Sequence, residues 1–182
     1  MHASNPVRVG VRTLIVAVIA LVAALLPGVA QAAPPTADFD FSQYRSVNAD
    51  AYRSLAYSDN GRHYFTTGRW SCQIGPQANA AACKGRPATA PPGVIGVAFA
   101  GESQGPYWVR PGSSFRLGPV SGFRAPVLPI GSRITVVNVT CAVPRAGVVA
   151  CRNWNRGFQL SRGTHRFLYP AGDTAHDGNP KR

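Results

Sequence analysis

Acidic side chains are scarce in this sequence. Its 182 residues include 7 Asp and Glu against 19 Lys and Arg, which gives a formal net charge of +12 at neutral pH. Glu102 is the only glutamate. A glycosidase site built from two glutamates is therefore excluded, and any paired-carboxylate site would need an aspartate partner.

Catalytic and cofactor motifs are also missing. The sequence contains no P-loop, no dinucleotide-binding fingerprint and no G-x-S-x-G elbow. Its cysteines are not spaced as C-x-x-C, which argues against a redox motif and against the close pairs of a zinc site. We therefore predict no catalytic residue, no metal ligand and no cofactor, and we interpret the chain as non-enzymatic.

The first 32 residues have the pattern of a secretory signal peptide. Arg8 and Arg12 precede an apolar run over residues 13–26, and Ala30 and Ala32 form an A-x-A cleavage site. The run is shorter than the ~20 residues of a membrane-spanning helix, so we favour a cleaved signal over an uncleaved membrane anchor. We expect an exported protein, secreted or in the cell envelope, without a transmembrane span after cleavage.

The remaining chain is long enough for one modest domain. We expect a flexible leader over residues 33–43, a single disulfide-stapled domain over 44–170 and a disordered tail over 171–182. Asp173 and His176 could be drawn as part of a metal site, but a site needs a rigid support that such a tail lacks.

The four cysteines predict two local disulfides, which persist in an oxidising compartment. Residues 132–143 alternate as a strand, and residues 147–153 can return antiparallel through a turn at Gly147. This arrangement would place Cys141 opposite Cys151, within disulfide range. Cys72 and Cys83 then pair by elimination. We interpret both bonds as structural staples.

Short β-prone runs separated by Gly and Pro predict a mainly β fold. We expect a small antiparallel sandwich or half-barrel, with at most one short N-terminal helix within residues 39–56. The proline-rich segment 84–92 is interpreted as a loop or hinge between an N-terminal and a C-terminal half, and no internal repeat is strong enough to predict. The strand candidates are residues 63–71, 94–100, 107–110, 133–143, 148–152, 158–161 and 166–169.

Two blocks of the sequence are distinctive. The first comprises Phe65-Thr66-Thr67-Gly68, Trp70-Ser71-Cys72-Gln73-Ile74 and Cys83-Lys84-Gly85 with Pro87. The second comprises Leu128-Pro129-Ile130-Gly131-Ser132-Arg133-Ile134, Cys141, Val149-Ala150-Cys151-Arg152-Asn153 and Gly157-Phe158-Gln159-Leu160-Ser161. Over residues 45–165 the chain resembles a group of small exported proteins from mycobacteria and related actinobacteria. The resemblance implies a signal-bearing, disulfide-linked secreted or envelope protein, and it implies no reaction.

The basic charge indicates anionic partners. Removal of Arg8 and Arg12 with the signal lowers the net charge from +12 to +10, and nearly all of the remaining cations are arginine. We expect binding to anionic lipid or envelope polymer, and we do not expect nucleic acid as a partner in vivo. Arginine side chains could bind phosphate or carboxylate, and an arginine with a neighbouring aromatic could stack on a sugar or a base. The residues predicted for this surface are Arg69, Trp70, Trp108, Arg110, Arg152, Trp154 and Arg156.

Two alternative functions stay open. One is a hydrolase of envelope polymers, with a site assembled from Asp59, His63, Glu102 and His165. The other is a secreted factor that engages a host or neighbouring protein.

We interpret the segment that begins at Arg162 as an ordinary turn.

Overall fold

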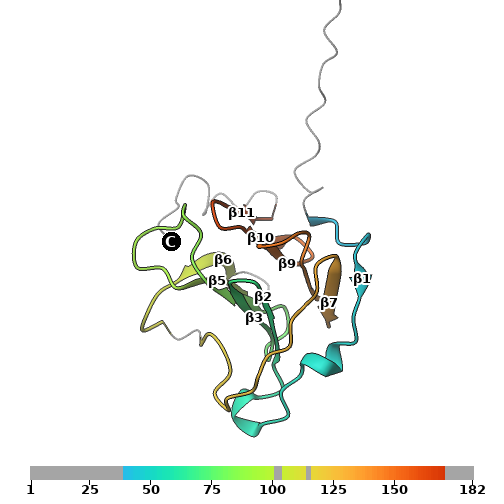
Figure 1. The fold of residues 1–182 in the computed structure, drawn as a ribbon. Coiled ribbons are helices and arrows are strands. Elements are labelled where there is room, and N and C mark those ends of the chain that lie inside the picture. Colours follow the sequence, from blue (N-terminus) through green and yellow to red (C-terminus); the bar gives the residue numbers. More distant parts are fainter. Residues whose placement is uncertain (1–38, 101–103, 114–115, 171–182) are drawn as a thin grey trace, which may run out of the picture. The chain divides into compact units, whose positions relative to one another are not determined.

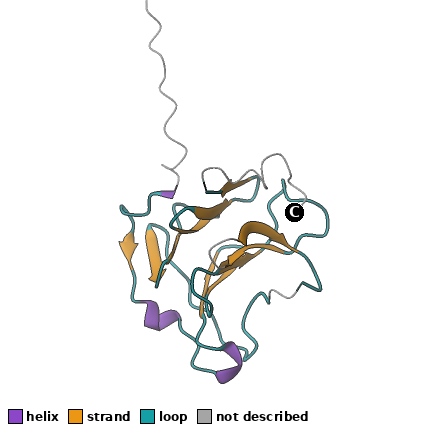
Figure 2. Cartoon of the chain, turned by 180° about the vertical axis from the view of Figure 1, so that it is seen from behind, coloured by secondary structure: helices purple, strands orange, loops and turns teal. Residues whose placement is uncertain are grey.

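The computed structural model describes residues 39–100, 104–113 and 116–170, and these residues form two β-sheets (Figures 1 and 2). The expected signal peptide and tail lie outside the described residues. The predicted fold class is confirmed, because the described chain is mainly β and largely antiparallel, and the two sheets share one hydrophobic core.

The first sheet consists of five antiparallel strands that neighbour one another in chain order. Each strand is short and each connection reverses the chain, so the sheet is a meander. Its strands are β2 (His63–Thr67), β3 (Trp70–Ile74), β4 (Ala81–Lys84), β5 (Gly96–Ala100) and β6 (Gln104–Val109).

The second sheet has six strands, and β7 to β11 form a second antiparallel meander in chain order. The short β1 extends this sheet by parallel pairing with β7. Its strands are β1 (Arg45–Ser46), β7 (Ser132–Val136), β8 (Val139–Ala142), β9 (Val149–Asn153), β10 (Arg156–Leu160) and β11 (His165–Leu168). Two short 3-10 helices, η3 (Ala49–Tyr52) and η4 (Tyr57–Asp59), lie between β1 and β2.

Both predicted disulfides are confirmed. Cys72–Cys83 joins β3 to β4, and Cys141–Cys151 joins β8 to β9, with Cα atoms 4.0 Å apart in each pair. In both cases the two cysteines are direct cross-strand partners. Each bond therefore links the second and third strands of its own meander.

The two meanders correspond to each other strand by strand, a repeat that the sequence did not reveal. In each sheet, one row of cross-strand partners packs on the core between the sheets. The first row is Phe65, Cys72, Cys83, Val97 and Trp108, and the second is Ile134, Cys141, Cys151, Phe158 and Phe167.

The outer face of the second sheet is covered by the segment that precedes β1. Phe39 and Phe41 are only 2% and 3% exposed and pack on Ala142 and Ala150. The packed domain therefore includes residues 39–43, which we had assigned to the flexible leader. Burial of two aromatic rings explains why this segment lies on the sheet.

The outer face of the first sheet is covered by residues 116–118. The amide of Gln73 donates a hydrogen bond to the Arg116 carbonyl at 2.8 Å and accepts one from the Gly118 N–H at 2.8 Å. Leu117 packs beside the buried Ala82 and Ala98.

The strand predictions missed β4, and in two other places they joined two strands into one. Residues 63–71 and 132–143 are each two strands joined by a two-residue turn, at Gly68-Arg69 and at Val137-Asn138. Val137 has φ of +53°, a conformation that a β-branched residue rarely adopts, so no local signal marks this turn. Residues 85–92 belong to the loop between β4 and β5 of the same sheet, so the segment is a loop, as one alternative had it, and not a junction between two halves.

Candidate functional site

The three tryptophans predicted to form an anion-binding surface differ in exposure. Trp70 and Trp108 are only 1% and 7% exposed, whereas Trp154 is 68% exposed. The indoles of Trp70 and Trp108 therefore belong to the core and do not offer a ring face to a ligand. This corrects the predicted surface at both positions.

The four arginines predicted for that surface lie at two ends of the sheets. Arg69 precedes β3 and Arg110 follows β6, at one end of the first sheet. Arg152 and Arg156 flank the β9–β10 turn, near the opposite end. The predicted residues therefore do not form a single patch.

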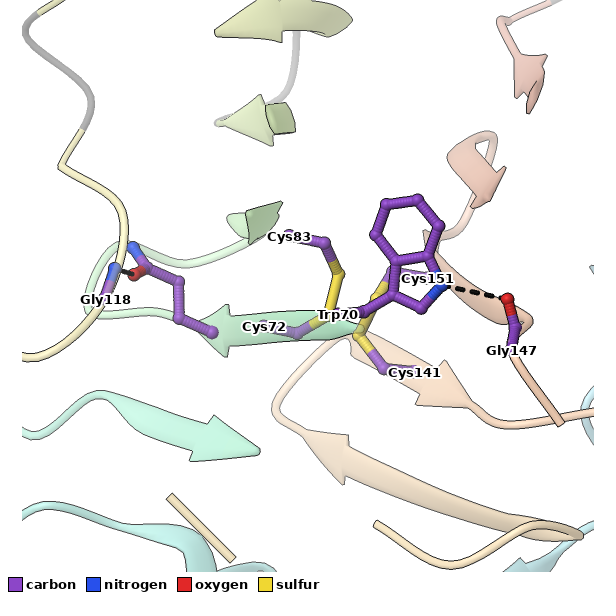
Figure 3. Close-up of a disulfide and its surroundings, with 8 residues drawn as sticks. Trp70, Cys72, Cys83, Gly118, Cys141, Gly147 and Cys151 are labelled. Atoms are coloured by element: carbon purple, nitrogen blue, oxygen red, sulfur yellow. Dashed lines mark hydrogen bonds between the residues drawn. A yellow bond between two sulfur atoms is a disulfide. The ribbon is translucent and has the colours of Figure 1, made fainter. Parts of the chain in front are cut away.

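Trp70 connects the two meanders instead of facing solvent (Figure 3). Its indole N–H donates a hydrogen bond of 2.9 Å to the carbonyl of Gly147, in the β8–β9 connection. The six-membered part of the indole lies against Gly85. A Cβ atom on residue 85 would come within 2.4 Å of the Cε3 atom of Trp70. The Arg69 guanidinium lies 5.5 Å from the centre of the ring, so the buried tryptophan helps to position an exposed cation.

Three arginines line one cavity at this end of the molecule. Arg69, Arg86 and Arg162 surround a volume of about 430 Å³ together with Pro87 and Ala88. All three arginines are exposed. We call this cavity the arginine pocket.

A hydrogen bond between the two meanders assembles the arginine pocket. The Ala88 N–H donates to the Arg162 carbonyl at 2.9 Å, which joins the β4–β5 loop to the β10–β11 turn. That turn is closed by hydrogen bonds between Ser161 and Thr164. The segment that we interpreted as an ordinary turn at Arg162 therefore contributes to the pocket.

The arginine pocket carries an uncompensated positive charge. No carboxylate lines it, and Asp40, Asp50 and Asp59, the acidic residues of the described chain, all lie elsewhere. Guanidinium groups bind phosphate and carboxylate through two parallel hydrogen bonds. The arrangement is suited to holding an anionic group.

A second cavity lies between the meanders at the opposite end of the first sheet. It has a volume of about 350 Å³ and receives residues from the β3–β4 loop, the start of β2 and the β7–β8 turn. We call it the amide cleft, and its main side chains are Arg53, Asn60, His63, Gln77, Asn79 and Val137.

Asp59, proposed for a hydrolase site, has a structural role. Its buried carboxylate accepts hydrogen bonds from the Ser54 hydroxyl at 2.6 Å, from the Val120 N–H at 2.7 Å and from the Ser121 hydroxyl. Burial alone would raise the pKa of Asp59, but the hydrogen bonds from Ser121, Ser54 and Val120 lower it to about 2. The carboxylate thus fastens the chain around residue 120 to η4.

The two histidines of the proposed hydrolase site lie in different environments. His63 lines the amide cleft. His165 packs 4.6 Å from the Trp108 ring centre and lies 2.7 Å from the Thr89 hydroxyl. Burial lowers the pKa of both histidines, and the charge of Arg53 adds to the effect at His63. Glu102 lies outside the described residues, and the three members that are described do not share a site.

The described residues contain no group of three His, Cys, Asp or Glu side chains that could hold a metal ion. Within the same part of the chain, no helix is sufficiently long and apolar to cross a membrane. Comparison with protein-family models, curated proteins and solved structures gives no match to this chain.

Arg86 and Arg162 were missed by sequence reasoning because they are far apart in the chain and neither is next to an aromatic residue. The Gly and Pro beside Arg86 and the Gly after Arg162 mark both as loop positions, which is a weak signal. Only the contact between the β4–β5 loop and the β10–β11 turn brings them together.

Proposed function

We propose that the protein is an exported, non-enzymatic binding protein of the cell envelope, and that the arginine pocket holds phosphate or carboxylate groups of envelope polymers or lipids. One observation carries the proposal: Arg69, Arg86 and Arg162 line one cavity, and no carboxylate of the described residues lines it with them. The two disulfides are compatible with an oxidising compartment outside the cytoplasm.

Two of the three arginines of the pocket have side-chain contacts that restrict them before any ligand arrives. Arg69 lies against the fixed ring of Trp70, and an Arg86 guanidinium nitrogen donates to the Ala90 carbonyl at 3.4 Å. Restricting these long side chains in advance reduces the entropy lost when an anion is bound. Because the pocket is open to solvent, its affinity for anions should fall as salt concentration rises.

The test compares two variants that lose the same charge. Arg69→Gln/Arg86→Gln/Arg162→Gln removes the pocket cations, and Arg45→Gln/Arg116→Gln/Arg124→Gln removes three exposed arginines elsewhere. Binding is measured to phosphatidylglycerol vesicles, to phosphatidylcholine vesicles and to a soluble polyphosphate, over a range of salt concentrations.

We expect the wild type to prefer the anionic probes at low salt, and we expect the pocket variant to lose about tenfold in affinity. The control variant should lose much less. Equal losses in the two variants would mean that overall charge accounts for binding, and would overturn the assignment to this pocket. Loss of vesicle binding alone would identify lipid as the ligand, and loss of polyphosphate binding alone would identify a polymer.

A second candidate function is engagement of a protein partner, which two neighbouring apolar side chains favour. Leu55 is 88% exposed and Tyr57 fully exposed, on a loop whose base is fixed by Asp59. A partner that co-purifies with the wild type should be lost from Leu55→Ser/Tyr57→Ser and retained by the triple arginine variant. The reverse pattern would count against this candidate.

A further inference from the structure

The amide cleft lies away from the arginine pocket and has a different chemistry. Its volume of about 350 Å³ is within the range of small-ligand sites, ~300–1,000 Å³. Its walls come from both meanders, because the β3–β4 loop faces the β7–β8 turn. It is therefore a cavity that neither meander would form alone.

The polar side chains of the cleft are mostly uncharged. Asn60, Gln77 and Asn79 each carry an amide that both donates and accepts hydrogen bonds. His63 offers a neutral imidazole near pH 7, because burial and the Arg53 charge lower its pKa. Among the described residues, no carboxylate lines the cleft and Arg53 is its single cation. Such a lining matches a ligand whose groups are at once donors and acceptors, as hydroxyl groups are.

One of these amides lacks a hydrogen-bond partner. Asn79 is only 7% exposed, and its Oδ1 has no donor within the described chain. Its backbone is fixed in the left-handed region at φ +63°, and its carbonyl accepts a hydrogen bond from the Asn153 amide at 3.3 Å. Of the six buried side-chain atoms without a partner in the described chain, it is the one that belongs to a residue lining the cleft. Buried acceptors are nearly always paired in folded proteins, and a donor from a bound molecule would pair this one.

The remaining wall of the cleft is apolar. Ile74, Pro76 and Val139 line it, and Val137 stands at its rim with 75% of its surface exposed. Val137 keeps a backbone of φ +53°, whereas the matching turn between β2 and β3 has Gly68 at φ +55°. A strained β-branched residue at the mouth of a cavity supplies a fixed apolar surface there.

We propose that the amide cleft binds one uncharged pyranose sugar residue. The ring hydroxyls would be shared among the amides of Asn60, Gln77 and Asn79 and the imidazole of His63. The apolar C–H face of the ring would rest on Val137 and Pro76. A single sugar residue would use few hydrogen bonds, so the affinity for a free monosaccharide is in the millimolar range.

The experiment uses the folded chain and free monosaccharides. Saturation-transfer NMR is recorded with glucose, galactose, mannose and arabinose at millimolar concentration. Gln77→Ala removes an exposed amide, and Asn79→Gly removes the buried amide while keeping a residue that tolerates positive φ. Asn155→Gly, in the exposed β9–β10 turn, serves as the matched control.

We expect transfer to at least one sugar, a loss of about tenfold in affinity in Gln77→Ala and Asn79→Gly, and no change in Asn155→Gly. The triple arginine variant should bind the sugar normally, which separates this proposal from the function proposed for the arginine pocket. Absence of transfer to every sugar, or wild-type binding by Gln77→Ala, would overturn the proposal. If Asn79→Gly fails to fold, Gln77→Ala decides the result.

Discussion

The two meanders of this protein share one plan and differ in their connections. Strands β2–β6 and β7–β11 each place a disulfide between their second and third strands and turn one row of side chains to the common core. The connections after the first and second strands match in length, at residues 68–69 and 137–138 and at residues 75–80 and 143–148. After the third strand, the first meander has the long loop 85–95, where the second has a turn at residues 154–155.

Both cavities arise at the connections of this repeated fold and not along its strands. Loop 85–95 contributes Arg86 to the arginine pocket, and loop 75–80 contributes Gln77 and Asn79 to the amide cleft. In each case a short turn of the second meander forms the facing wall. The common strands provide stability, and the connections at the two ends of the sheets provide the cavities.

The largest expected effect concerns the matching positions Trp70 and Val139, which begin the second strand of each meander. Both are 1% exposed, but only Trp70 also hydrogen-bonds to the other meander. We expect Trp70→Ala to lower the free energy of unfolding by about 3–5 kcal/mol and Val139→Ala by about 2 kcal/mol. Urea denaturation followed by circular dichroism measures both. Equal losses would show that Trp70 is not a special link between the halves.

The two disulfides should contribute equally. They close loops of nearly the same length, with sequence separations of 11 and 10. In a chain-entropy model, Cys72→Ala/Cys83→Ala and Cys141→Ala/Cys151→Ala should each lower the free energy of unfolding by about 2–3 kcal/mol. Denaturation of both variants under the same conditions tests this. A loss twice as large in one variant would end the claim of equivalence.

Asp59 accepts hydrogen bonds from Val120 and Ser121, which lie in the segment that connects the two meanders. The described residues of the second meander contain no matching carboxylate. Its folded pKa, about 2, lies below the ordinary value of 3.8. The stability it gives is therefore present above the ordinary pKa and is lost as pH falls through the folded pKa. We expect Asp59→Asn to cost about 1–3 kcal/mol at neutral pH, from loss of hydrogen bonds to a charged group.

The check on Asp59 is denaturation at several pH values. The difference between wild type and Asp59→Asn should shrink as pH falls from 4 toward about 2, because the wild-type carboxylate is then protonated. Asp50→Asn, at an exposed position in η3, is the control. A difference that stays constant over this pH range would show that the charge of Asp59 is not what fastens the chain.

The smallest effect is expected at the two matching hairpin turns. Gly68 and Val137 both have positive φ at the first turn position, and only Gly adopts this conformation without strain. Gly68→Val should therefore destabilise the protein by about 1–3 kcal/mol. Val137→Gly should stabilise it by up to about 1 kcal/mol, since relief of strain exceeds the added freedom of the unfolded chain. Thermal denaturation of both variants measures these effects. A lower melting temperature for Val137→Gly than for the wild type would show that the turn at Val137 is not strained.

Much of the fold followed from local pattern. Cys141 and Cys151 lie on runs that alternate with the period of a strand, and Gly147 between them takes the expected positive φ, here +72°. The turn at Val137 was missed because Val137 is a strand former, and Asn138 alone does not outweigh the strand formers on both sides. β4 was missed because it consists largely of alanine, which does not favour strands.

The candidate sites were much harder to predict than the fold. The burial of Trp70 and Trp108 depends on packing between the two sheets, and an aromatic beside an arginine looks the same in sequence whether it faces the core or solvent. Arg69 was identified, but Arg86 and Arg162 join it only through the contact between Ala88 and the β10–β11 turn.

The sequence by itself determined the β class, the two disulfide pairs and the excess of arginine, because strand alternation, cysteine spacing and composition are local or additive properties. The tertiary structure alone decided which arginines share a pocket, which indoles are buried and that the side-chain oxygen of Asn79 lacks a partner in the described chain. These depend on how two corresponding meanders pack face to face and on which loop meets which turn. Such contacts join residues far apart in the chain, and no local pattern records them.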